Sequence, residues 1–288
     1  MGAIKTRRAM RVKLTIATIC LAGVAGAWID TGHMVVAAVA RDGLTSAARA
    51  QIQALLAEDP DPRTNTLAMS SCWADDTKTR ETGLWHYHDI FFRTDGKPPL
   101  NKVEGESALT AMSRFTQVLG DRGASVIARR EALKYIVHIV GDLHQPLHSV
   151  ARETDALPKG DRGGNDFKVI SPAEWEPAPR SLHFLWDMGA GAFMPTPRPL
   201  EPSGESKIDG IAAELRRIFP PGLFPQTAEL DPKKWTQEGL KLSQELVYSL
   251  PESSRPSQVY LSVAQATSLR QATLGGYRLA ALLNKLLR

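Results

Sequence analysis

The stretch "SVIARREALKYIVHIVGDLHQPLHSV", residues 125–150, decides the fold. Its middle is strongly apolar, which is typical of a helix that lies inside a protein. Near its end stands Pro146, which has no backbone donor and whose ring clashes with the carbonyl of Asp142 in a helix. The sequence therefore predicts one long buried helix that kinks or ends close to Pro146 and carries histidine and aspartate side chains into the interior.

Outward from this stretch, most of the chain also has a helical pattern of apolar residues. The further segments expected to be helical are 33–42, 45–59, 106–123, 206–219, 231–250 and 257–287. Few runs alternate with period two, and only "DFKVI" at 166–170 is expected to form a short strand. Residues 151–179, rich in glycine and proline, form the least regular segment and could cover a site. We expect a mainly α fold in a single domain without internal repeats.

The first 27 residues have the three parts of a secretory signal peptide. Five basic side chains precede an apolar stretch at 14–24, and Ala25-Gly26-Ala27 forms an A-x-A cleavage site. An uncleaved membrane anchor is the alternative, but this apolar stretch is too short to span a bilayer. We therefore expect residues 1–27 to be removed and residues 28–288 to be exported, to the periplasm or the medium.

Removal of the leader changes the charge and the cysteine content of the chain. The formal net charge would fall from +4 to −1, because residues 1–27 carry five basic and no acidic side chains. Nucleic-acid binding would then depend on a local site rather than on a generally basic surface. Cys72 would be the only cysteine left, so no internal disulfide is expected. The chain is long enough to bury a sizeable core without one.

Two pairs of histidine and aspartate suggest metal binding. His138 and Asp142 are four residues apart, as are His183 and Asp187, so each pair shares one helix face. Such a pair can offer a nitrogen and an oxygen ligand to one ion, although a single pair is more often an ordinary hydrogen bond. Two pairs, one of them in an apolar run, favour metal because buried polar groups need partners. A helix end before His148 would direct that side chain toward a different ion.

Three other stretches add groups that can bind a metal. "SCWADDTK" at 71–78 and "LWHYHDI" at 84–90 contain further histidine, aspartate and lysine residues. The third is the mature amino terminus, where Trp28 is followed by His33. A free α-amine has a pKa near 8, far below that of lysine, and its nitrogen and the carbonyl oxygen of the same residue can chelate one ion. The alternative is that Trp28 is only a buried aromatic residue beside a cleavage site.

Together these motifs resemble those of the zinc-dependent, single-strand-specific nucleases of the S-one/P-one type, which are related to zinc-dependent phospholipase C. The resemblance runs from Trp28 to Asp187. The motifs, in order, are Trp28 with His33, "WADD" at 73–76, "LWHYHD" at 84–89, "HIVGDLHQPLH" at 138–148, "GGN" at 163–165 and "LHFLWD" at 182–187. The resemblance implies a single-domain multi-helix fold with three zinc ions at the base of a cleft.

The resemblance also implies which residues bind each ion. The first zinc ion would be held by Asp75, His86, His138 and Asp142. The second would be held by His148, His183 and Asp187. The third would be held by the amine and carbonyl of Trp28 and by His33, with Asp142 bridging the first and third ions. His88 and His144 are left over and are expected to form hydrogen bonds around the ligands.

The same resemblance implies the reaction. A hydroxide shared by two zinc ions would attack phosphorus in line, with Asp75 and Asp142 at the attacking water and Lys78 near the leaving oxygen. The 3′ O–P bond would break and 5′-phosphates would be released. Single-stranded RNA and DNA are the implied substrates, together with 3′-mononucleotides. The residues expected to contact the base are Tyr87, Asp89 and Asn165, and stacking on Tyr87 requires an unpaired base.

Two other functions remain open from the sequence. One is a phospholipase C that uses the same metals on a choline-type headgroup; the Trp28-to-His33 spacing, Asp187 in place of glutamate, and the Asp89/Asn165 pair count against it. The other is an exported zinc-binding protein without catalytic activity. In each case we expect a monomer with no stable protein partner and no membrane attachment after the leader is removed.

Overall fold

The computed structural model describes residues 28–172 and 174–288, so the predicted leader at 1–27 lies outside the described residues. The described part of the chain is mainly helical, as predicted. None of its helices combines the length and apolar character needed to cross a bilayer. The α-helices are α1 (Asp30–Asp42), α2 (Ser46–Ala57), α3 (Leu67–Ser70), α4 (Trp73–Asp76), α5 (Ala108–Gly120), α6 (Val126–Asp142), α7 (Leu182–Asp187), α8 (Pro202–Ile218), α9 (Pro232–Glu245) and α10 (Gln258–Leu286).

Short 3₁₀ turns and two strands complete the described chain. The turns are η1 (Pro62–Thr64), η2 (Thr82–His86), η3 (Pro146–Ser149), η4 (Gly189–Gly191), η5 (Pro221–Leu223), η6 (Pro225–Ala228) and η7 (Val247–Ser249). The strands are β1 (Ile90–Phe92) and β2 (Val150–Arg152), which pair in parallel. Neither strand is predicted by the sequence, since three residues are too few to show a period of two.

The helix that opened the sequence analysis is shorter than predicted. α6 begins after Ser125, whose hydroxyl accepts a hydrogen bond from the amide of Ala128, and it ends at Asp142 rather than reaching residue 150. Pro146 instead begins η3, where its missing N–H costs no helical hydrogen bond. His138 and Asp142 therefore share the last turn of α6, whereas His148 belongs to a separate turn with its own direction.

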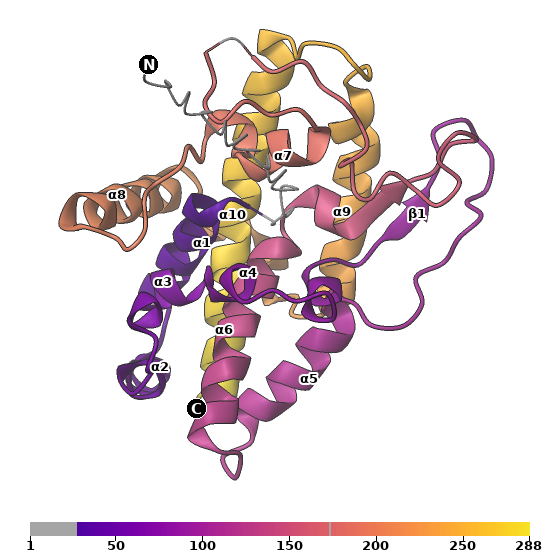
Figure 1. Cartoon of the computed structure of the whole chain (residues 1–288). Helices are drawn as coiled ribbons and strands as arrows, with labels where there is room; N and C mark the ends of the chain where they lie inside the picture. Colours follow the sequence, from indigo (N-terminus) through magenta and orange to yellow (C-terminus); the bar gives the residue numbers. More distant parts are fainter. Residues whose placement is uncertain (1–27, 173) are drawn as a thin grey trace, which may run out of the picture.

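α1, α6 and α10 pack together in the middle of the molecule, where α10 is the longest helix (Figure 1). Glycines allow the close approach: a methyl group on Gly276 of α10 would lie 2.5 Å from Cγ1 of Val39 on α1. A Cβ on Gly141 of α6 would lie 2.7 Å from Nδ1 of His33 on α1. The second of these contacts matters for function because it brings His33 against the end of α6, where Asp142 stands.

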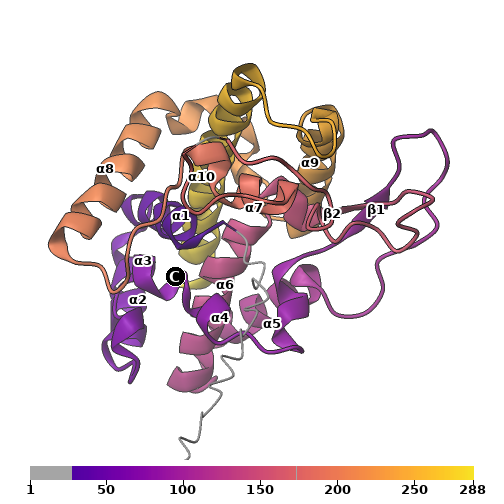
Figure 2. The same cartoon turned by 45° about the horizontal axis from the view of Figure 1, so that its top comes forward.

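The apolar core has two parts that meet around α6 and α7. The larger cluster joins α1, α2, α5, α6, α8 and α10, and the smaller one surrounds α7 and includes residues of β1, β2 and α10. α8 and the β1 segment lie on opposite sides of this assembly (Figures 1 and 2). The end of α6 and the whole of α7 are thus fixed on several sides, which holds their polar side chains in place.

The parallel pair β1–β2 joins two segments that both carry predicted site residues. Ile90 faces Val150 and Phe92 faces Arg152 in the register. The predicted strand at 166–170 is wrong: Lys168 makes only an isolated bridge to Ser181, and the other residues of that segment form no strand. The local pattern of "DFKVI" was misleading because a strand needs several consecutive residues paired with a neighbouring strand, and here only Lys168 has such a partner, Ser181.

Candidate metal centre and its pocket

Six elements bring the predicted side-chain ligands together. α1 provides His33, α4 provides Asp75, η2 ends at His86, and η3 contains His148. The remaining ligands come in pairs from the last turn of α6 and from α7, as the four-residue spacing predicts. In three groups, candidate ligand atoms lie within 4.8 Å of one another: His33–His138–Asp142, Asp75–His86–His138 and His148–His183–Asp187.

Asp142 lies at the middle of the first two groups and is wholly buried. Its Oδ1 is 3.3 Å from Nε2 of His33. Its Oδ2 is 3.2 Å from Nδ1 of His86 and 3.3 Å from Nε2 of His138. The two carboxylate oxygens thus face different histidines, which is the arrangement that a bridging carboxylate requires.

The third group holds two histidine rings that meet edge to edge. Nε2 of His148 is 3.1 Å from Nε2 of His183, and Asp187 lies 3.5 Å from the same nitrogen of His183. The other ring nitrogen of each histidine is 2.7 Å from a backbone carbonyl, that of His86 for His148 and that of Gly163 for His183. A carbonyl only accepts, so each Nδ1 carries the proton and each Nε2 carries a lone pair.

The same argument fixes the tautomer of His138. Its Nδ1 is 2.7 Å from the carbonyl oxygen of Ser71, so Nδ1 is the donor and Nε2 carries the lone pair. That Nε2 faces Nδ1 of His86 at 2.9 Å as well as the carboxylate of Asp142. Lone pairs and carboxylates that face one another repel unless a proton or a cation lies between them. This donor set therefore fits a metal ion, with backbone carbonyls orienting the imidazoles.

The pKa values of the buried groups reflect this imbalance. Burial lowers the pKa of His138, but the carboxylates of Asp142 and Asp75 outweigh it and raise the pKa to about 9. Burial, followed by the charge of His138, lowers the pKa of His33 to about 3. Burial raises the pKa of Asp187 well above its usual value, although a hydrogen bond from Gln145 opposes the shift. Divalent cations would balance the charge of these carboxylates without any proton.

Unpartnered polar atoms point to the same conclusion. Both ring nitrogens of His33, Nε2 of His86 and both carboxylate oxygens of Asp142 are buried and form no hydrogen bond in the described part of the chain. Buried polar atoms are rarely left without a partner. Five such atoms in one cluster fit metal coordination, and imidazole and carboxylate are the ligands that zinc uses in catalytic sites. The residues present therefore fit the implied zinc ions.

Trp28 is fixed directly beside this cluster. Its side chain is wholly buried, and its indole N–H donates to the carbonyl of Gly141, 2.9 Å away. The ring also packs edge-on against Phe193, with ring centroids 5.2 Å apart. The next amide, that of Ile29, donates to the carbonyl of Asp187 at 3.0 Å. The segment that begins at Trp28 is thus held between the ends of α6 and α7, next to Asp142.

A pocket of about 340 Å³ opens onto the cluster. Its lining includes three candidate ligands, His86, His148 and His183. The predicted substrate residues Lys78, Tyr87, Asp89 and Asn165 line the same pocket. Loop 151–179 contributes Arg162, Gly163 and Asn165 to its wall, so the least regular segment does cover the site, as expected.

Lys78 and Asp75 form the polar edge between the pocket and the cluster. Nζ of Lys78 donates to Oδ1 of Asp75 at 2.8 Å, and 20% of the Asp75 side chain is exposed. Burial raises the pKa of Asp75, but the charges of His138, Lys78 and His86 bring it down to about 2. Asp75 is thus an anion that is open to solvent on one side, within reach of a water molecule in the pocket.

The two left-over histidines differ in their surroundings. Nδ1 of His88 lies 3.1 Å from the hydroxyl of Ser107, at the start of α5. His144 is buried, with Nδ1 2.7 Å from the carbonyl of Val140 and Nε2 3.1 Å from the guanidinium of Arg278. Neither is in a metal-binding group among the described residues, so both remain predicted hydrogen-bonding residues.

Two polar residues that organise the site were not predicted from the sequence. The amide of Gln145 donates to Oδ1 of Asp187 at 2.7 Å, and its oxygen accepts from the amide of Leu147. Asp161 is wholly buried and accepts from the amides of Arg152 and Gly164 and from the hydroxyl of Tyr248. Gln145 lies inside "HQPLH" and Asp161 precedes "GGN", so position within the motifs was the available signal for both.

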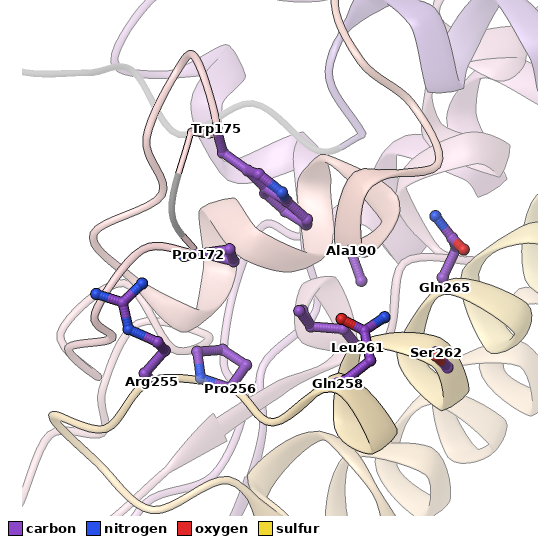
Figure 3. Close-up of a pocket in the computed structure, with 9 residues that line it drawn as sticks. All are labelled: Pro172, Trp175, Ala190, Arg255, Pro256, Gln258, Leu261, Ser262 and Gln265. Carbon is purple, nitrogen blue, oxygen red and sulfur yellow. The ribbon is translucent and has the colours of Figure 1, made fainter.

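A second hollow, of about 430 Å³, lies against η4 and the start of α10 (Figure 3). Trp175 points into it from the loop above, and Gln258 and Gln265 reach it from α10. Among the described residues, no histidine or carboxylate lines this hollow. It lacks the ligands that a catalytic metal needs, so the pocket at Lys78 and His148 is the candidate functional site.

Fold and site together define a mainly helical protein with a candidate multinuclear metal centre at one wall of a pocket. The chain belongs to the S1/P1 nuclease family: the family model described as S1/P1 Nuclease matches residues 28–288. The match begins at Trp28 and includes the C-terminal third, for which the sequence analysis found no motif. Family membership confirms the resemblance inferred from the six motifs.

Individual relatives agree with this membership. Nuclease S1 of Aspergillus oryzae is 29% identical over 184 residues, which cover 60% of this chain and 58% of the relative. Nuclease P1 of Penicillium citrinum is 29% identical over 168 residues, 56% of this chain and 57% of the relative. Endonuclease 1 of Arabidopsis thaliana is 23% identical over 94% of this chain and 91% of the relative. The chain thus spans little more than half the length of the two fungal relatives but most of the plant one.

Proposed function

We propose that residues 28–288, freed from the leader 1–27, act as an exported zinc-dependent nuclease. In this proposal the protein hydrolyses single-stranded RNA and DNA, and 3′-mononucleotides, at the 3′ O–P bond and leaves 5′-phosphates. One observation carries the proposal: three groups of converging ligand atoms adjoin a pocket that also contains Lys78, Tyr87, Asp89 and Asn165. The family match favours a nuclease over a phospholipase C.

Nine residues would hold three zinc ions. The proposed ligands are Asp75, His86, His138 and Asp142 for the first ion, His148, His183 and Asp187 for the second, and Trp28, His33 and the shared Asp142 for the third. When bound, the ions would acidify water and neutralise charge on phosphate oxygens. The opposed lone pairs of His148 and His183 and the unpartnered oxygens of Asp142 support this assignment.

Asp75 and Lys78 would handle charge and protons at the phosphate. Asp75 is anionic and partly exposed, so its free oxygen can accept a hydrogen bond from the attacking water and orient it. Lys78 donates to Asp75 and also lines the pocket, so its ammonium can compensate the charge that develops on the leaving 3′ oxygen. Their 2.8 Å hydrogen bond holds the proposed acceptor for the attacking water beside the proposed cation for the leaving oxygen.

Tyr87, Asp89 and Asn165 would bind the nucleobase. The side-chain nitrogen of Asn165 donates to the carbonyl of Arg162 at 2.8 Å, so its amide oxygen remains to accept from a base. Burial, with a smaller contribution from the charge of Asp161, raises the pKa of Asp89 to about 7. A base that stacks on Tyr87 cannot at the same time be paired within a duplex, which accounts for a single-strand preference.

The test uses purified protein that begins at Trp28, loaded with zinc and offered single-stranded DNA, duplex DNA, RNA and phosphatidylcholine vesicles. We expect cleavage of the single-stranded substrates, with 5′-phosphate ends identified by mass spectrometry. The Asp142→Asn variant is the control for a contaminating nuclease. Release of phosphocholine alone would establish a phospholipase, and bound zinc without turnover would establish a non-catalytic binder. Products with 3′-phosphates would refute the assigned bond.

A further inference from the structure

Arg198 connects two segments that are distant in the sequence. It lies in the loop between η4 and α8, and only 16% of its side chain is exposed. Its Nε donates to Oδ2 of Asp30 at 2.7 Å. Its two terminal nitrogens donate to the two oxygens of Asp76, at 2.8 and 2.7 Å. A guanidinium is permanently charged and planar, so one side chain can hold two carboxylates in a fixed geometry.

Each of these carboxylates stands beside a residue of the candidate metal centre. Asp30 is the first residue of α1, two positions after Trp28. Asp76 directly follows Asp75 and ends α4. Arg198 therefore joins the segment that carries the candidate amine ligand to the helix that carries a candidate carboxylate ligand.

The other contacts of the terminal segment lead mainly elsewhere. The Trp28 indole and the Ile29 amide hydrogen-bond to Gly141 and Asp187, at the ends of α6 and α7. Toward α4, the other polar contact of this segment within the described chain is a long one, from Sγ of Cys72 to the carbonyl of Asp30 at 3.7 Å. Asp76 has one weaker neighbour, Arg63, at 3.7 Å. Loss of Arg198 would leave Asp30 and Asp76 as like charges on either side of the vacated guanidinium position.

We infer that Arg198 is a positioning residue for the metal centre: it holds the Trp28 segment and α4 in register so that the terminal amine and Asp75 reach the same cluster. Arg198 also binds Asp76, the second acid of "WADD", so that of these two acids Asp75 is the one that faces the histidines. The inference rests on the proposed function, because it presupposes that Trp28 and Asp75 bind metal. Within the described chain, the hydrogen bonds of Arg198 go to Asp30 and Asp76 and not to a candidate ligand atom.

The experiment compares zinc content and stability of Arg198→Gln with those of the parent, both beginning at Trp28. We expect about one zinc fewer per chain after dialysis, or an affinity about 10-fold weaker for that ion. The melting temperature of metal-free Arg198→Gln should stay within roughly a few degrees of that of the metal-free parent. Arg217→Gln is the matched control, since Arg217 forms an equally short two-bond pair with Glu214 on the exposed face of α8.

A second background separates positioning from general stability. A chain with one extra Met before Trp28 has no free amine at that residue, so Arg198→Gln should cost it less zinc than it costs the chain that begins at Trp28. Equal losses in both backgrounds, or unchanged zinc content in Arg198→Gln, would overturn the inference. Arg198→Lys keeps the charge but lacks the planar guanidinium with its several donors, so it should lose an intermediate amount of zinc. This variant replaces Arg198→Gln in the comparison if the glutamine variant does not fold. A parent protein that binds no zinc would instead refute the proposed function.

Discussion

At the scale of single residues, the orientation of the histidines is set by main-chain carbonyls. The carbonyls of Ser71, His86 and Gly163 each fix one imidazole, those of His138, His148 and His183. Each ring then directs its lone pair into the cluster, which is the form that a metal requires. The motifs identified these histidines, but no motif states which nitrogen of each ring accepts and which donates. That information comes from the path of the backbone.

Asp142 and Asp187 should differ in their importance. Asp142 is proposed to bridge two ions and faces three histidines, whereas Asp187 serves one ion. We expect Asp142→Asn to lower kcat/KM by at least about 100-fold and Asp187→Asn by about 10-fold, with a larger loss of zinc in the former. Steady-state kinetics and elemental analysis measure both. Near-parental turnover and zinc content in Asp142→Asn would exclude a bridging role.

Asp89 should make base preference depend on pH. With a pKa of about 7, its carboxyl group is an anion above that pH and is protonated below it. The anion accepts two hydrogen bonds and suits guanine, while the acid donates one and accepts one and suits adenine. The ratio of kcat/KM for 3′-guanylate to that for 3′-adenylate should therefore fall as pH falls through 7. A ratio taken at each pH cancels titration of the metal centre.

Asp89→Asn is the control for this pH dependence. An amide does not titrate in this range, so the ratio should become flat between about pH 6 and pH 8. A ratio that is flat in the parent protein, or that changes equally in the variant, would assign base preference to other residues.

At the scale of helices and strands, α10 supports α6 from behind the metal cluster. Arg278 of α10 is wholly buried, donates to both oxygens of Glu238 at 2.7 Å and lies 3.1 Å from Nε2 of His144. His144 in turn contacts the carbonyl of Val140 within α6. This chain of hydrogen bonds fixes the last turn of α6 without reaching the ligand atoms themselves.

Arg278→Met should therefore destabilise the fold more than it disturbs metal binding. Removing the guanidinium leaves Glu238 and His144 without their partner, which costs about 3 kcal/mol of unfolding free energy. Urea unfolding of the metal-free protein measures this loss. The comparison variant is Lys241→Gln, whose ion pair with Glu245 is 3.9 Å long and largely exposed. An effect as small as that of Lys241→Gln would mean that the buried network contributes little.

The helices were predictable from sequence and their connections were not. The apolar residues predicted segments close to α1, α2, α5, α8, α9 and α10, because the pattern of burial along a helix is present within the segment itself. The end of α6 and the pair β1–β2 depend on contacts between distant segments, such as the bond from the amide of His88 to the carbonyl of His148. Arg198 was missed for the same reason, since its partners Asp30 and Asp76 lie 168 and 122 residues away in the sequence.

At the scale of the whole molecule, the candidate ligands tie together segments from Trp28 to Asp187. Without zinc, Asp142 would be compensated by a proton on His138, Asp187 by its own proton and Asp75 by Lys78, so the ions would no longer join these segments. We expect EDTA to abolish activity and to lower the melting temperature by on the order of 10 °C, because ligand binding adds to the stability of the folded state. Calorimetry with and without EDTA measures this, and readdition of zinc should reverse it. An unchanged melting temperature together with full activity would exclude a zinc enzyme.

The parallel pair β1–β2 also fixes the distance between a proposed base-binding residue, Asp89, and a proposed metal ligand, His148. Asp89 directly precedes β1, and His148 stands two residues before β2. The amide of His88 donates to the carbonyl of His148 at 2.8 Å. A residue of the proposed base pocket and a ligand of the proposed metal centre are thereby joined through one short, paired piece of backbone. In the proposed function, this piece of backbone fixes the distance between the base and the phosphate of the same bound nucleotide. We therefore expect an oligonucleotide to be cleaved more slowly at an abasic position, which offers the proposed pocket no base, than at the same position with its base.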